Sequence, residues 1–218
     1  MRNFWQRFLA LLTPGVQLLL CLLAAMYLAA VIGKWVRAFD LYDWLALSGP
    51  KFWSGQIWRL ASYALLPVGI LDFVMNSVAL VMLGGMLERH WSRGELWLYC
   101  VVAAAGAGLT KVVLQFSSPL PLTGAAPTVF GLLIAWGFLC GRENISLVPF
   151  GEMTVWKLVV VAGAISFLIM FFTAGLVTAI IMAGGGLTGF VYLWLKHKWL
   201  MSRASSVIHS ERINRLEL

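Results

Sequence analysis

Asp72 and Asn76 interrupt an apolar run, and their side chains are polar groups that could do chemistry there. Their spacing places both on one face of a helix. A carboxylate within a membrane-spanning segment is costly and is therefore a functional candidate. Burial would favour its neutral form, whereas a nearby Lys111 cation would favour the charged form. Three roles stay open for Asp72: a structural hydrogen bond, binding of a client or an ion, and proton transfer.

Hydroxyl groups occur near the apolar runs, but no histidine lies beside them. Four hydroxyl residues are candidates: Ser117, Ser118, Thr123 and Thr128. The three histidines all fall at the other ends of the runs: His90, His197 and His209. A hydroxyl is a poor nucleophile until a base activates it. We interpret these hydroxyls as helix caps or as donors to carbonyls of their own helices.

The cysteines offer no recognisable site. Cys21, Cys100 and Cys140 all lie inside apolar runs, where a thiol usually behaves as a small hydrophobe. Their spacing matches neither a zinc-ligand pattern nor a disulfide framework. We therefore expect no metal and no cofactor.

Membrane-spanning helices must position these residues. The chain has 218 residues, of which 61% are hydrophobic and 11% charged, whereas soluble domains have about 25% charged residues. Six stretches approach the roughly 20 apolar residues that a span requires. They are residues 15–32, 70–87, 94–116, 125–140, 156–172 and 175–195. We predict one all-α membrane domain over residues 1–200, a six-helix transmembrane bundle, and a cytoplasmic tail over residues 201–218 that could form a short amphipathic helix.

The connections between the spans also carry information. The last two spans are joined by almost nothing, Thr173-Ala174-Gly175, and must be antiparallel. Residues 33–56 combine aromatic residues with Asp40, Asp43 and Lys51, a composition typical of a segment lying in the membrane interface. We predict an interfacial first loop.

Basic residues outnumber acidic ones by 16 to 9, and they cluster at the ends of the spans. Anionic lipid head groups are a simpler partner for them than nucleic acid. With six spans, most of them share one face: Arg2, Arg7, Arg89, Arg93, Arg142, Lys157, Lys196, Lys198, Arg203, Arg212 and Arg215. The positive-inside rule then places both termini in the cytoplasm.

Three motifs occur in order along the chain. The first is Trp58-Arg59, followed by Asn76, Gly84-Gly85 and Glu88. The second runs from Gly124 to Gly131, and the third from Gly184 to Gly189. The chain resembles the rhomboid family of intramembrane serine proteases, in the bacterial pattern, over five of the six predicted spans. The resemblance implies a rhomboid-like bundle in a bacterial inner (plasma) membrane.

In that family a serine on the fourth helix attacks the peptide carbonyl and a histidine on the sixth accepts its proton. The resemblance places Ala126 and Met182 at these two positions. Tyr63 and Pro67 occupy two earlier histidine positions, expected on the second helix. An artificial serine replacement would explain Ala126 but not the other changes. We therefore expect no catalytic residues.

The family's oxyanion site is altered in the same way. Asn76 is retained, but Asp72 replaces a histidine, and an ionised carboxylate would repel an oxyanion. Pro127 replaces a glycine and removes a backbone N–H. Losing one oxyanion donor typically costs about 100- to 1,000-fold in rate.

Other residues are candidates for binding or structure. Trp58 and Arg59 are expected to anchor the first loop, either through specific partners or only through the interface. Phe130, with Asp72 and Asn76, is a candidate for client binding. Small residues allow helices to approach closely in lipid, so Gly124 and Gly131 are expected to pack against Gly185 and Gly189. Glu88 either joins a solvated charge cluster or ties down the inner end of a helix.

The resemblance implies a rhomboid pseudoprotease that binds transmembrane segments of client proteins, as inactive rhomboids and derlins do, and holds, shields or delivers them. Membrane lipids and a membrane protease or other effector are the expected partners. A first alternative is a rhomboid protease that works through an unrecognised arrangement. A second is a small transporter or channel, which Asp72, Lys111 and the glycine-rich sixth span would favour.

Overall fold

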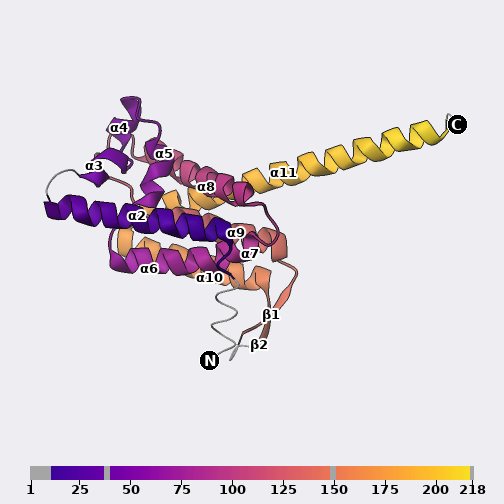
Figure 1. The fold of residues 1–218 in the computed structure, drawn as a ribbon, viewed down its shortest axis with the longest axis horizontal. Coiled ribbons are helices and arrows are strands. Elements are labelled where there is room, and N and C mark those ends of the chain that lie inside the picture. The colour runs from indigo at the N-terminus through magenta and orange to yellow at the C-terminus, as the bar shows by residue number, and fades with distance from the viewer. Residues whose placement is uncertain (1–10, 37–39, 148–150, 217–218) are drawn as a thin grey trace.

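The computed structural model describes residues 11–36, 40–147 and 151–216, with the side chains of residues 146, 147, 151 and 203–216 left out. The chain is mostly helical and passes back and forth between the two ends of a bundle (Figure 1). Arg2, Arg7 and the charged side chains of the tail, which entered the topology prediction, lie outside the described residues.

Long helices form the bundle. They are α2 (Pro14–Val36), α6 (Ile70–Ala79) continued by η2 (Leu80–Gly84) and α7 (Gly85–Leu87), α8 (Arg93–Leu114), α9 (Ala126–Cys140), α10 (Val155–Ala174) and α11 (Leu176–Leu216). Among the described residues, five segments are long and apolar enough to cross a membrane. Helix α9 has 15 residues, about 22 Å of helix, and is shorter than the hydrocarbon layer of roughly 30 Å.

The first loop folds into short helices at one end of the bundle (Figure 1). These are α3 (Leu41–Leu45), α4 (Gly49–Trp53), α5 (Arg59–Ser62) and η1 (Tyr63–Leu65). Arg59, the first residue of α5, is buried, and its guanidinium donates to the carbonyl oxygens of Asp43 at 2.7 Å and Ala46 at 2.6 Å. Arg59 therefore holds the loop through specific backbone contacts.

Helices α8, α9 and α11 form the core because small residues let their backbones approach. A Cβ added to Gly106 of α8 would collide with Thr188 of α11, and one added to Gly184 of α11 would collide with Thr110 of α8. The Thr188 and Thr110 hydroxyls donate to carbonyls of their own helices, so neither is left without a partner. Close backbone approach replaces the hydrophobic driving force that lipid does not supply.

Glu88 joins the end of α7 to the start of α2. Its carboxylate accepts hydrogen bonds from the Thr13 hydroxyl and from the backbone nitrogens of Gly15, at 2.8 Å, and Val16, at 3.0 Å. The first N–H groups of a helix have no partner within the helix and favour a negative charge. Only 6% of the Glu88 side chain is exposed, and the exposed Arg93 places its Nε 3.9 Å from Oε1. Glu88 therefore ties down a helix end and also pairs with one of the basic residues beside it.

Two parts of the fold differ from the sequence prediction. Strands β1 (Asn144–Leu147) and β2 (Gly151–Thr154) form an antiparallel hairpin, so the protein is not strictly all-α. Asn-Ile-Ser-Leu alternates polar and apolar residues, the period of a strand. Helix α11 continues past residue 200 to Leu216 and projects beyond the bundle (Figure 1). No glycine or proline follows Gly189 to end it.

We expect Glu88→Ala to lower the free energy of unfolding by about 2 kcal/mol, because it leaves buried N–H groups of α2 without an acceptor. Thermal unfolding in detergent measures the change. The control is Glu152→Gln, which alters an exposed carboxylate on β2 and should change stability by less than about 0.5 kcal/mol. Equal stability of the two variants would contradict the role of Glu88.

Candidate functional site

The two positions that the resemblance assigns to the catalytic pair lie beside a contact between α9 and α11. Ala126 is the first residue of α9, and Met182 is buried on α11. Gly185, one turn after Met182, approaches so closely that an added Cβ would lie 3.0 Å from the carbonyl oxygen of Pro127. A methyl group and a thioether therefore occupy these positions, and neither can activate or act as an oxygen nucleophile.

The described histidine side chains lie at the other end of α9. The ligand atoms of His90 lie close to Cys140, the last residue of α9. The His197 ring packs edge-on against Phe138. Neither histidine is near Ala126. His209 has no described side chain.

Asp72 stabilises the start of α6. It is half-buried in the first turn of that helix. One carboxylate oxygen accepts a hydrogen bond from the backbone nitrogen of Val68 at 3.0 Å, and the other accepts one from Nδ2 of Asn76 at 2.8 Å. The carboxylate thus orders the turn that leads into α6 and orients the Asn76 amide. Its position at a helix end lowers the cost expected for a carboxylate deep in the membrane.

Gly124 lies beside Asp72 and does not pack between helices. It precedes α9 with a φ of +96°, a conformation that favours glycine. An added Cβ would lie 3.3 Å from the Asp72 carboxylate. The predicted packing role therefore falls to the other glycines: Gly131 and Gly185 lie at the contact of α9, α8 and α11, and Gly189 faces the ring of Tyr99.

Lys111 is buried on α8, but its partner is not Asp72. Its ammonium group donates to the side-chain oxygen of Gln115, one turn later on the same helix. Lys111 and Gln115 therefore form a local pair on α8. Asp72 and Lys111, the two charged residues that would favour a transporter or channel, therefore have separate hydrogen-bond partners.

Two buried tyrosines connect the elements around the site. The Tyr63 hydroxyl donates to the carbonyl of Ala104 at 2.9 Å, and the Tyr99 hydroxyl donates to the carbonyl of Gly131 at 2.7 Å. Tyr63 lies in η1, and Pro67 lies in the turn after it, so the expectation that both belong to the second helix was wrong. Sequence reasoning missed the tyrosines' role because an aromatic residue in an apolar run is typical of an ordinary core.

The charged residues of the first loop are structural. The hydrogen bond from Lys51 holds the pKa of the Asp43 carboxyl below its usual value. Burial lowers the pKa of the Arg59 guanidinium from its ordinary value. Arg59 is bound to loop carbonyls and to Oε1 of Gln56, so it is not free to bind an anion.

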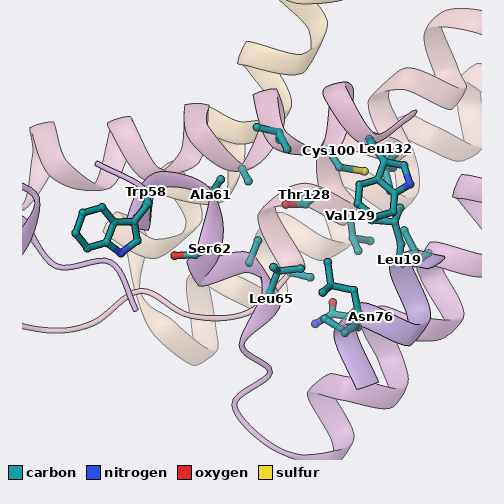
Figure 2. Close-up of a pocket in the computed structure, with 18 residues that line it drawn as sticks. Leu19, Trp58, Ala61, Ser62, Leu65, Asn76, Cys100, Thr128, Val129 and Leu132 are labelled. Carbon is teal, nitrogen blue, oxygen red and sulfur yellow. The ribbon is translucent and has the colours of Figure 1, made fainter. Parts of the chain in front are cut away.

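A cavity of about 390 Å³ lies next to these residues. Its walls come from α2, the end of the first loop, α6 with η2, α8 and α9, and they are almost entirely apolar (Figure 2). Three lining residues have a hydroxyl or amide side chain: Ser62, Asn76 and Thr128. Two lining tryptophans, Trp58 and Trp97, each add an indole N–H. The volume lies in the range of roughly 300–1,000 Å³ that is typical of ligand sites.

Thr128 carries an unsatisfied hydroxyl at this cavity. The residue is 7% exposed, and its Oγ1 has no hydrogen-bond partner among the described residues. The expectation that it donates to its own helix was therefore wrong. A buried hydroxyl without a partner costs about 1–3 kcal/mol. Thr128 is thus a lining residue of the cavity whose buried hydroxyl has no acceptor among the described residues.

Phe130 lines a different cavity. This second space, of about 700 Å³, lies between α9, α10 and α11. Helix α10 is peripheral, since 11% of its most apolar stretch is buried inside the protein. The five candidate binding residues therefore do not form one site: Trp58 and Asn76 line the first cavity, Phe130 lines the second, and Asp72 and Arg59 line neither.

We expect Asp72→Asn to retain the fold and to lower the free energy of unfolding by about 1 kcal/mol, because the amide keeps one of the two acceptor oxygens. Asp72→Ala removes both and should cost about 2 kcal/mol. Chemical denaturation in detergent distinguishes them. If Asp72→Asn left stability unchanged but abolished binding of a membrane segment, Asp72 would contact the segment itself.

The comparisons with known proteins agree with the motifs. The model of the rhomboid domain matches residues 54–199, from the end of the first loop to α11. The rhomboid protease GluP of Bacillus subtilis (strain 168) is 33% identical over 81 residues, which cover 37% of this chain and 15% of that protein. The chain thus matches a small part of that relative's length. The match of the domain model to most of the chain shows that this protein belongs to the rhomboid family.

Proposed function

We propose that this protein binds the membrane-spanning segments of client proteins and does not cleave them. The observation that carries this proposal is the pair Ala126 and Met182 at the positions of the family's serine and histidine. Pro127 and Asp72 support it, because both alter the oxyanion site. The closest described histidines lie at the other end of α9, which argues against a relocated base.

The first cavity is the proposed binding site. A client helix would place apolar side chains against its walls, and the Thr128 hydroxyl would donate to a carbonyl or polar side chain of that helix. Hydrogen bonds between membrane helices contribute about 0.6 kcal/mol on average. The bound segment would then supply the partner that Thr128 lacks.

The membrane arrangement is part of the same proposal. Helix α9 serves as a sixth, short span, the first loop lies in the interface, and both termini face the cytoplasm of a bacterium. Four basic residues support this arrangement, because they lie at the end of the bundle where α2 begins. Arg89 follows α7, Arg142 follows α9, Arg93 begins α8, and Lys196 of α11 pairs with Glu95 in the first turn of α8. The projecting part of α11 is available to an effector such as a membrane protease (Figure 1).

Thr128→Val should have opposite effects on stability and on binding. Removing an unsatisfied hydroxyl should raise the free energy of unfolding of the free protein by about 1 kcal/mol. Removing a donor to the client should weaken association about threefold. Energy transfer between the labelled protein and a labelled single-span helix in liposomes measures association. The control is Thr173→Val, which removes an exposed hydroxyl on α10 that donates to the carbonyl of Ile169. It should change neither stability nor association. Lower stability of Thr128→Val with unchanged association would refute the first cavity as the binding site.

The proposal also predicts no proteolysis. The purified protein should leave a rhomboid substrate intact and should not react with a fluorophosphonate probe, since no hydrogen bond joins a serine to a histidine among the described residues. The alternative, a rhomboid protease, is favoured by the name of the relative. Probe labelling at any serine, together with substrate cleavage, would replace the binding proposal with that alternative.

A further inference from the structure

Three side chains that can bind a metal gather at the end of α9 away from the cavity: His90, Cys140 and Glu143. Their ligand atoms, one from each residue, all lie within 4.8 Å of one another. His90 lies in the turn after α7, Cys140 ends α9, and Glu143 precedes β1. The fold therefore joins three separate segments at this point. The proposed function makes no use of it.

The imidazole of His90 is oriented for binding. Its Nδ1 lies 3.2 Å from the carbonyl oxygen of Met86. A carbonyl only accepts hydrogen bonds, so this contact requires the tautomer that carries its proton on Nδ1, in which Nε2 keeps its lone pair. Histidines that bind metals usually donate their other ring N–H to a carbonyl or carboxylate in this way.

The geometry fits a tetrahedral ion after small side-chain movements. An ion with zinc-type bond lengths holds its ligand atoms about 3.5 Å apart. Cys140 is buried, with 4% exposed, whereas His90 and Glu143 are exposed and can rotate toward it. Their exposure also leaves a fourth position open to water.

The charges of the three groups also fit. Cys140 would bind as a thiolate, releasing its proton to solvent, and Glu143 as a carboxylate. Together they balance the two positive charges of a divalent ion, so the ion is tolerated beside the exposed Arg89 and Arg142. A nitrogen, sulfur and oxygen donor set suits zinc and disfavours magnesium and calcium.

We propose that His90, Cys140 and Glu143 form a zinc site that links the end of α7 to the end of α9 and to the β1–β2 hairpin. The sequence predicted no metal because the ligands are far apart along the chain and match no spacing pattern.

The test uses the full chain, purified in detergent without a histidine tag. We expect one equivalent of Zn²⁺ to bind and to raise the Tm. Co²⁺, used as the probe, should give a near-ultraviolet thiolate-to-metal absorption band. Cys140→Ser should abolish this band. His90→Gln and Glu143→Gln should weaken binding on the order of tenfold or more, and because both side chains are exposed the variants should fold normally.

Two matched controls separate this site from adventitious binding. Cys21→Ser changes an exposed cysteine on α2, and His197→Gln changes an exposed histidine on α11. Both should leave the stoichiometry, the band and the Tm shift unchanged. The proposal is overturned if no Zn²⁺ or Co²⁺ binds, if binding survives in the His90→Gln/Glu143→Gln double variant, or if the controls lose it. Because no client is involved, the result is independent of the proposed function.

Discussion

The close approach of α8, α9 and α11 is the constraint on which the rest of this structure depends. In lipid, apolar side chains gain little by contacting one another, so helix association depends on backbone proximity and hydrogen bonds. Gly106, Gly184 and Gly185 allow that proximity, because a Cβ at any of them would meet a neighbouring helix. The Tyr99 hydroxyl then joins α8 to α9. The position of Ala126 beside α11 follows from this packing.

Most polar groups around this core have hydrogen-bond partners, and the exceptions are therefore informative. Asp72 is bound to its own helix start, Lys111 to Gln115, and Glu88 to the start of α2. Thr128 has no partner among the described residues and borders an apolar cavity. The buried charges thus have partners, whereas two buried hydroxyls, those of Ser77 and Thr128, have none among the described residues.

The contacts that hold the first loop in this rhomboid scaffold do not involve the positions assigned to the catalytic pair. Arg59 holds the first loop through three hydrogen bonds, and Tyr63 joins the end of that loop to α8. Neither contact needs a serine or a histidine. The scaffold can therefore persist where the positions that the resemblance assigns to the catalytic pair carry a methyl group and a thioether.

The sequence by itself determined the membrane class, five of the spans and the family motifs, because apolar length and residue identity are local properties. It also gave the residue types at the positions that the resemblance assigns to the catalytic pair. Alternation in Asn144–Leu147 could also have indicated the hairpin. The sequence could not place Gly124 against Asp72, assign Lys111 to Gln115, or leave Thr128 without a partner, because each depends on which helix lies opposite. Only the tertiary structure brought His90, Cys140 and Glu143 together, since contacts between distant segments follow from helix packing and have no spacing pattern of their own.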